Sequence, residues 1–265
     1  MLQAASAFGN SGQTIGPEPG ADESRTYLAI LPLAMLGALG LPVLIDVAQS
    51  VIRTERLATH TRTVLMASVV AFLTGFIACA WFALPDQALS QISSSRWRQA
   101  LSSGLIASIN TRTAGLPIEY VYDYPRAMQW LLILLMLIGG APASAAGGLK
   151  LTTLIVLFAG VRRALRGEAP GRSFGVALVW LGIFAILIFF SMLWLLGSAP
   201  EISSDRALFI TASAVSNVGL SPDPLSITAA NGYALSMTML LGRLFPICIL
   251  WWMAVTTNDG EIAVA

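Results

Sequence analysis

Charged side chains are scarce in this sequence. They make up 11% of its 265 residues, less than half of the roughly 25% typical of soluble domains. A soluble fold has too much surface to cover with so few charges. Disorder is excluded because it needs low hydrophobicity and high charge, whereas 56% of the chain is hydrophobic and its formal net charge is +1. A net charge this small also provides no global field to attract nucleic acid.

Cysteine and histidine are almost absent. Cys79 and Cys248 are the only cysteines, and both lie in apolar runs, so a disulfide scaffold is excluded. With the single histidine, His60, they cannot form a zinc-type ligand set. No P-loop, dinucleotide fingerprint or Ser/His/Asp group is visible. We therefore expect no cofactor bound by this chain and no enzyme activity.

Long apolar runs are abundant instead. A membrane-spanning helix needs about 20 mostly apolar residues. Four runs reach that length: Tyr27–Val51, Thr63–Leu84, Ser173–Leu196 and Asn231–Thr256. The sequence therefore predicts an all-α polytopic membrane protein.

A fifth apolar run, Pro125–Val161, is too long for one helix and is interrupted. Its middle, Gly139–Gly148, contains only small residues and one proline, and we call it the glycine-rich link. Glycine and proline are the weakest helix formers, so we predict two half-helices joined by a non-helical link at membrane depth. The arginines of Arg53–Arg62 and Arg162–Arg172 place these two linkers on the cytoplasmic side.

Short polar segments repeat along the chain. Ser6–Gly12 and Ser213–Gly219 share the pattern Ser-Ala-x-x-Asn-x-Gly, and Asn110–Gly115 fits loosely around its final glycine. The three final glycines lie 103 and 104 residues apart, which indicates duplication, although each segment taken singly resembles an ordinary turn. Helix-like stretches, Ser95–Ala107 and Ser203–Val215, precede the later two segments. The repeat predicts units of span, short re-entrant helix, polar glycine segment and span.

A polar segment that re-enters the membrane is tolerated within protein or beside a water-filled path. Several such segments around one axis can point carbonyl oxygens inward and replace the hydration shell of a small cation. The residues predicted to surround the ion are Asn10, Ser11 and Gly12 (the first glycine segment), Thr113, Ala114 and Gly115 (the middle glycine segment), and Asn217, Val218 and Gly219 (the last glycine segment).

These segments resemble the Trk/Ktr/HKT potassium transporter family, in particular its TrkH/KtrB-type membrane subunit. The glycine-rich link with Leu151–Thr153 resembles the intramembrane gating loop, and Leu241–Pro246 resembles a motif of the last span. The resemblance implies four span–pore helix–span units around one pore, with about two and a half units present. Residues 1–62 are then the end of the second unit, 63–172 the third unit and 173–265 the fourth.

The resemblance implies the pore-forming subunit of a potassium uptake system, in which the backbone at Gly12, Gly115 and Gly219 holds K⁺ on its way to the cytoplasm. It also implies a multi-pass protein of the bacterial inner membrane, a homodimer, and a cytosolic nucleotide-binding regulatory subunit of the TrkA/KtrA type. Two alternatives stay open. One is a broken-helix secondary cation transporter. The other is an inactive truncated fragment, because two and a half units cannot surround an ion.

A gate is implied below the filter. Its predicted residues are Gly139, Gly140, Gly147, Gly148, Lys150 and Arg243. Arg243 is the only charge in its apolar run, and a lone intramembrane arginine must face water or a partner. It either forms an electrostatic barrier to cations or binds carbonyls of broken helices. Lys150 either holds the link or extends to the cytoplasm.

Two further charged residues have open roles. We expect Arg112 to point behind the filter and to anchor it through hydrogen bonds to carbonyl groups. Asp46 is either a pore carboxylate or a helix residue near the cytoplasmic interface.

Overall fold

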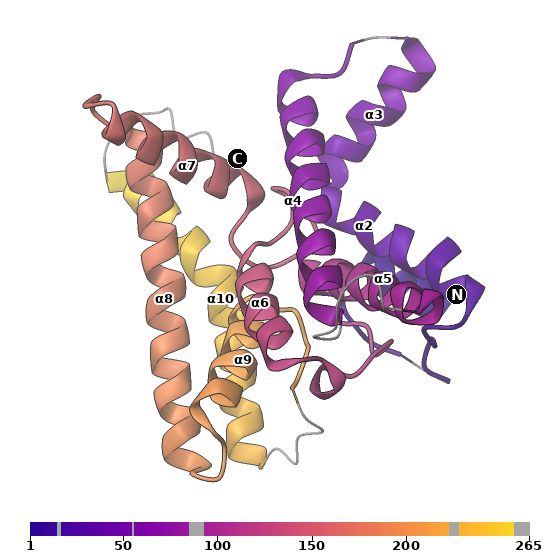
Figure 1. Ribbon diagram of the computed structural model, residues 1–265. Helices are drawn as coiled ribbons and strands as arrows, with labels where there is room; N and C mark the ends of the chain where they lie inside the picture. The colour runs from indigo at the N-terminus through magenta and orange to yellow at the C-terminus, as the bar shows by residue number, and fades with distance from the viewer. Residues whose placement is uncertain (15–16, 55, 85–92, 223–227, 257–265) are drawn as a thin grey trace.

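The computed structural model describes residues 1–14, 17–54, 56–84, 93–222 and 228–256 (Figure 1). In these ranges the chain is helical, with one isolated bridge between Ile138 and Leu149 and no strand. The all-α prediction is confirmed.

Two groups of helices follow one another along the chain. The first half contains α1 (Leu2–Phe8), the π turn η1 (Thr26–Ile30), α2 (Leu31–Leu39), α3 (Leu41–Arg53), α4 (Thr59–Ala83), α5 (Ser94–Ile109) and the π turn η3 (Asn110–Ala114). The second half contains the 3₁₀ turn η4 (Val121–Asp123), α6 (Arg126–Leu137), α7 (Leu151–Leu165), α8 (Arg172–Ser198), α9 (Ser204–Val215) and α10 (Ala229–Thr256).

The two groups meet at α6 (Figure 1). Helices α8, α9 and α10 pack against one another, and α6 packs against both α9 and α4. Met128, Leu132 and Met136 of α6 are buried there with Cys79 of α4 and Phe209 of α9. This apolar cluster joins elements from both halves of the chain, so the glycine segments lie in one continuous structure.

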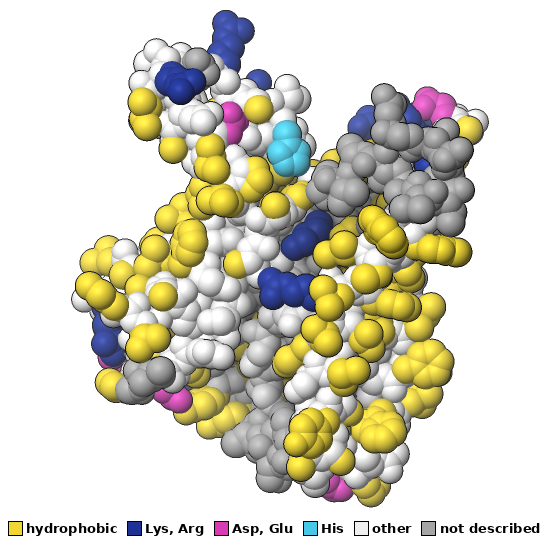
Figure 2. All heavy atoms as spheres, turned by 180° about the vertical axis from the view of Figure 1, so that it is seen from behind, with side chains coloured by type: hydrophobic (Ala, Val, Ile, Leu, Met, Phe, Trp, Pro, Cys, Tyr) yellow, Lys and Arg dark blue, Asp and Glu magenta, His cyan; other side chains and the backbone are white. Residues whose placement is uncertain are grey.

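Three helices in the described part are long and apolar enough to cross a membrane: α4, α8 and α10. Only 17–22% of their most apolar stretches are buried, and Figure 2 shows hydrophobic side chains along the outer faces of both groups. Apolar side chains on exposed faces suit contact with lipid. The predicted spans at 63–84, 173–196 and 231–256 are confirmed, as are the short helices at 95–107 and 203–215 and the two half-helices α6 and α7.

The predicted span Tyr27–Val51 is not one straight helix, because the chain bends by 101° between α2 and α3. Together the two helices are still long and apolar enough for one broken span or a re-entrant loop. Gly40 lies at the bend with φ +83°, in a region that only glycine adopts readily. A Cβ atom at Gly40 would lie 2.7 Å from the carbonyl oxygen of Pro142. Pro42 follows in the first turn of α3, a position that proline favours. Hydropathy cannot reveal this bend, since the apolar run continues through it.

Candidate functional site

The first glycine segment follows a helix end of defined geometry. The backbone N–H of Asn10 donates to the carbonyl oxygen of Ala7 (3.1 Å), and the N–H of Ser11 donates to that of Ser6 (3.0 Å). This pair of bonds is the Schellman motif, with Asn10 in the left-handed region at φ +47°. Asparagine visits that region more readily than most residues.

The last glycine segment repeats this geometry. The N–H of Asn217 donates to the carbonyl oxygen of Ala214 (3.0 Å), and the N–H of Val218 donates to that of Ser213 (2.9 Å). Asn217 has φ +54°. The same six-residue motif, Ser6–Ser11, therefore recurs 207 residues later as Ser213–Val218, and the sequence repeat corresponds to a repeat of backbone conformation.

The middle glycine segment departs from this geometry. Helix α5 continues beyond Ile109 into the π turn η3, which includes Thr113 and Ala114. The turn ends at Gly115, whose φ is +57° and whose N–H lies 3.5 Å from the carbonyl oxygen of Asn110. Thr113 thus stands where the other two segments have a left-handed asparagine, which explains why the sequence match is loose.

The three glycine segments meet backbone to backbone. A Cβ atom placed on Gly12 would lie 2.6 Å from the carbonyl oxygen of Gly115, and one placed on Gly115 would lie 2.0 Å from that of Val218. Both distances are too short for a side chain, so glycine is required for this approach. At Gly219 a Cβ would meet no described atom within 4 Å, although its φ is +85°. The structure therefore brings the three predicted segments together.

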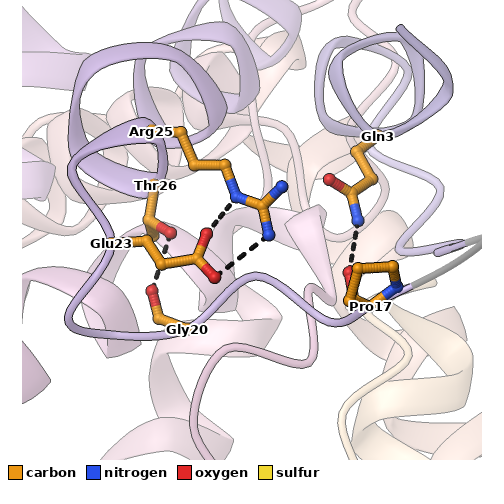
Figure 3. Close-up of polar contacts among 6 residues, drawn as sticks. All are labelled: Gln3, Pro17, Gly20, Glu23, Arg25 and Thr26. Atoms are coloured by element: carbon orange, nitrogen blue, oxygen red, sulfur yellow. Dashed lines mark hydrogen bonds and ion pairs between the residues drawn. The ribbon is translucent and has the colours of Figure 1, made fainter.

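The loop after the first glycine segment is tied to its neighbours (Figure 3). Gln3 of α1 donates through Nε2 to the carbonyl oxygen of Pro17 (2.7 Å), and the hydroxyl of Thr26 donates to that of Gly20 (2.8 Å). Both contacts fix the path from the glycine segment back to α2.

Side chains of the loops after the first and middle glycine segments also touch. The hydroxyl of Tyr120 donates to the carboxylate of Glu18 (3.2 Å), and this bond raises the pKa of Tyr120. Figure 3 shows an ion pair between Arg25 and Glu23 in the first loop. Both of its partners are exposed, so it contributes little stability.

Glu119 fastens the loop after the middle glycine segment to α5. Its carboxylate accepts from the hydroxyl of Ser103 (3.1 Å) and from that of Tyr124 (2.6 Å). Burial and the neighbouring carboxylate raise the pKa of Tyr124, so that phenol remains a donor. The loop is thereby fixed at both the short helix and the start of α6.

The glycine-rich link is non-helical, as predicted. The N–H of Gly139 donates to the carbonyl oxygen of Leu149 (2.9 Å), and the N–H of Leu149 donates to that of Leu137 (2.9 Å). These bonds bring the two ends of the link side by side. A Cβ on Gly139 would lie 1.9 Å from the carbonyl oxygen of Gly147, so the small residue is needed here.

The amide groups of the link face the end of α2. The N–H of Ala141 donates to the carbonyl oxygen of Ala38 (2.9 Å), and that of Ala145 donates to Gly37 (3.4 Å). The bend at Gly40 leaves these carbonyls in the last turn of α2 without helical partners. The broken helix and the link therefore satisfy each other's backbone groups.

Two basic side chains bind carbonyl groups of the link. Lys150 donates through Nζ to the carbonyl oxygen of Ala146 (2.7 Å), and Arg243 of α10 donates to that of Ala145. These contacts agree with the carbonyl-binding alternative for Arg243 and with the link-holding alternative for Lys150. The barrier expected of Arg243 stays a prediction.

The link also contacts the base of the last glycine segment. A Cβ on Gly147 would lie 2.1 Å from the carbonyl oxygen of Ser216 and 3.0 Å from the Cβ of Asn217. The residues predicted to form the gate, namely Gly139, Gly140, Gly147, Gly148, Lys150 and Arg243, therefore lie in or against one short stretch of irregular backbone.

The structure bears on the expectations for Arg112 and Asp46. The expected hydrogen bonds from Arg112 to carbonyl groups are not present in the described ranges. Arg112 instead lines a mostly apolar cavity of about 350 Å³ between α2 and α4. Asp46 of α3 accepts from the N–H of Ala58 (3.0 Å), which joins α3 to the residue before α4 and agrees with the role of a helix residue.

Sequence reasoning missed two glycines at helix crossings. A Cβ on Gly37 would lie 1.8 Å from the carbonyl oxygen of Phe8, and one on Gly242 would lie 2.2 Å from that of Val215. Helices α2 and α10 thus cross the ends of α1 and α9 at equivalent places. The signal was available in the sequence: each glycine follows its partner by a similar distance, 29 and 27 residues.

Spanning helices, short helices that end in converging glycine segments, and a non-helical link beside them define a polytopic helical membrane protein. The model of the TrkH family, described as "Cation transport protein", matches residues 2–256. The chain belongs to this family and is a multi-pass membrane protein, which in bacteria lies in the inner membrane.

Characterised relatives are similar over almost the whole chain. It is 27% identical to the "Potassium/sodium uptake protein NtpJ" of Enterococcus hirae, over 98% of this chain and 60% of the relative. It is also 27% identical to the "Ktr system potassium uptake protein B" of Bacillus subtilis, over 99% of this chain and 62% of the relative. The chain thus spans about 60% of the length of these relatives.

A solved structure has the same fold. The potassium transporter TrkH from Vibrio parahaemolyticus matches with a TM-score of 0.75 at 19% sequence identity, over 92% of this chain and 56% of that chain. This similarity agrees with the predicted fold class and concerns the fold alone.

Proposed function

We propose that the chain forms part of the pore of a potassium uptake transporter and that the three glycine segments line its ion filter. One observation carries this proposal: the backbones at Gly12, Gly115 and Val218 approach one another more closely than any side chain at the glycines would allow. Carbonyl oxygens held in this way can replace the water around K⁺. Both relatives are named for potassium uptake, and the name of one adds sodium; these names support potassium as a transported ion.

The nine residues of the three glycine segments are the proposed filter. K⁺ is the transported ion, and no bond is made or broken, so the proposed activity is not enzymatic. The membrane potential supplies the driving force for entry into the cytoplasm, about 2.3 kcal/mol per charge for each 100 mV. The pore units assigned to residues 1–62, 63–172 and 173–265 belong to the same proposal.

The glycine-rich link is the proposed gate. It lies against Ser216 at the base of the last glycine segment, and its carbonyls are held by Lys150 and Arg243. Movement of the link requires these contacts to break. Arg243 then acts in two ways, since it holds the link and places a positive charge on the path of the cation.

The proposed assembly is a homodimer with a cytosolic nucleotide-binding regulatory subunit. The support is indirect: two relatives are components of a "Ktr system", a name that denotes several components. The basic linkers Arg53–Arg62 and Arg162–Arg172 are the proposed docking surfaces.

The filter is tested with Gly115→Ala in the complete gene product, reconstituted in lipid vesicles. The substitution adds backbone strain at φ +57° and a contact of 2.0 Å with the carbonyl oxygen of Val218. We expect rubidium uptake driven by an inside-negative potential to fall about tenfold or more, since strain of this kind costs about 1–3 kcal/mol and 1.4 kcal/mol is a factor of ten.

Gly167→Ala is the matched control. Gly167 also has a left-handed backbone, at φ +76°, but a Cβ there would meet no described atom within 4 Å, and the residue lies between α7 and α8, outside the glycine segments. Because Gly167 lies in the linker Arg162–Arg172, uptake by both variants is measured without the regulatory subunit, and Gly167→Ala should then retain wild-type uptake. Equal uptake by the two variants at equal protein levels contradicts the filter assignment.

A further inference from the structure

The side chain of Asn110 closes a ring around the middle glycine segment. Its Nδ2 donates to the carbonyl oxygen of Leu116 (2.9 Å), and its Oδ1 accepts from the N–H of the same residue (3.2 Å). One amide side chain therefore pairs with both backbone groups of Leu116, whose carbonyl oxygen also accepts from the N–H of Ile118 (2.9 Å). The residues between the two partners include Thr113, Ala114 and Gly115, so these bonds fix both ends of that segment.

The surroundings shield this pair of hydrogen bonds from water. Asn110 is 3% exposed and Leu116 is fully buried. Leu116 belongs to an apolar cluster with Ile109, Ala114 and Ile106. Hydrogen bonds are electrostatically stronger in such surroundings, and an unpaired amide there is costly. The ring is therefore expected to persist while the protein is folded.

The other two glycine segments have no such ring. Counting back from the final glycine, the position of Asn110 is occupied by Ala7 and Ala214. Those two segments are held by the Schellman motif, with Asn10 and Asn217 in the left-handed region. The middle segment lacks that motif and has the π turn in its place. The hydrogen bonds of the Asn110 side chain thus hold the middle segment, where the Schellman motif is absent.

We propose that Asn110 is a positioning residue for ion selectivity, and this inference rests on the proposed filter function. The ring sets the place of the carbonyl group of Gly115, which adjoins Gly12 and is the contact between the first and middle glycine segments. Loss of the ring lets this carbonyl move, and the filter then discriminates less between large and small cations. Asn110 itself does not touch the ion.

The test uses the complete gene product in lipid vesicles and compares Asn110→Asp and Asn110→Ala with the wild type. Asp is nearly isosteric, but it replaces the donor to the carbonyl of Leu116 with an oxygen, so the two acceptors oppose each other. We expect the ratio of rubidium to sodium flux to fall about tenfold in this variant, as for the loss of one buried hydrogen bond. The Ala variant should show a smaller fall.

Asn231→Ala is the matched control. Asn231 is equally buried, at 3% exposure, and its Oδ1 accepts from the hydroxyl of Ser198 (2.6 Å), away from the glycine segments. Its loss should lower stability without changing the flux ratio. A change of the ratio in this variant as large as in the Asn110 variants would reduce Asn110 to a general structural role and overturn the proposal.

Hydrogen exchange provides a second readout that does not depend on transport. The N–H of Leu116 should exchange faster in Asn110→Ala than in the wild type, because its acceptor is gone. Unchanged exchange at Leu116, or an unchanged flux ratio in both Asn110 variants, overturns the proposal.

A wild-type protein that conducts no rubidium refutes the proposed filter. The inference about Asn110 then fails with it, even if the exchange rate at Leu116 changes in the variants. If Asn110→Asp does not insert into the vesicles, the flux ratio and the exchange rate of Asn110→Ala decide whether the proposal holds.

Discussion

The first and last glycine segments begin alike and continue differently. Both follow a Schellman motif with a left-handed asparagine, and both are crossed by a later helix at a glycine, Gly37 in α2 and Gly242 in α10. Beyond the crossing, α2 ends at the bend of Gly40, whereas α10 continues through Pro246. The repeated pattern therefore determines where the short helices α1 and α9 end. Residues after the crossing glycines determine whether the later helix breaks, as α2 does, or continues, as α10 does.

Because of this difference, the two helices bind different backbone groups of the glycine-rich link. Two of its amides, those of Ala141 and Ala145, donate to carbonyls at the broken end of α2. Two of its carbonyls accept from Lys150 and from Arg243 of the unbroken α10. The C-terminal end of a helix carries partial negative charge, which suits amide donors. The link is thus held between one helix that supplies acceptors and another that supplies a cationic donor.

The largest expected effect concerns the feature that the two segments share. Gly37→Ala and Gly242→Ala should each lower the free energy of unfolding by about 3 kcal/mol, the upper end for overpacking. The reason is that each new Cβ would lie about 2 Å from a backbone carbonyl oxygen, that of Phe8 or Val215. Denaturant unfolding in detergent measures the loss.

Gly182→Ala in α8 is the control for these two variants. It changes a helical glycine whose Cβ would meet no described atom within 4 Å, and it should raise stability by up to about 1 kcal/mol through helix propensity. If Gly242→Ala behaves like Gly182→Ala while Gly37→Ala does not, the two crossings are not equivalent and the comparison breaks down.

A smaller effect is expected at the feature that separates the two segments. Gly40→Ala places a side chain at φ +83° and 2.7 Å from the carbonyl oxygen of Pro142, at a cost of about 1–3 kcal/mol. Because the bend exposes the carbonyls that the link binds, the amides of Ala141 and Ala145 should exchange hydrogen faster. Gly167→Ala, strained but distant, should leave that exchange unchanged. Unaltered exchange in Gly40→Ala would show that the bend does not hold the link.

Much of the fold was predictable from hydropathy and repetition. The spans at α4, α8 and α10 and the short helices α5 and α9 follow from the length and the composition of their segments. The non-helical link follows from ten consecutive residues that are all small or proline. The glycine segments were found because two of them share a local pattern, and a local pattern of that kind determines a helix end.

What the sequence concealed depends on contacts between distant segments. The bend at Gly40 lies within an uninterrupted apolar run, and its cause is a backbone angle together with the approach of Pro142. The ring of Asn110 could not be predicted without knowing that α5 continues into a π turn. Arg112 faces an apolar cavity formed by two helices, and no local rule describes that environment.

The smallest expected effect distinguishes the two left-handed asparagines. The side chain of Asn217 donates through Nδ2 to the carbonyl oxygen of Met239 in α10 (3.0 Å), whereas the buried amide of Asn10 has no hydrogen-bond partner in the described ranges. Glycine keeps the left-handed backbone at either place. Asn217→Gly should therefore lower the free energy of unfolding by about 1 kcal/mol, the value of one hydrogen bond. Asn10→Gly removes an unpaired buried group and should not lower it, and an equal loss at both positions would mean that Asn10 has a partner in the folded protein.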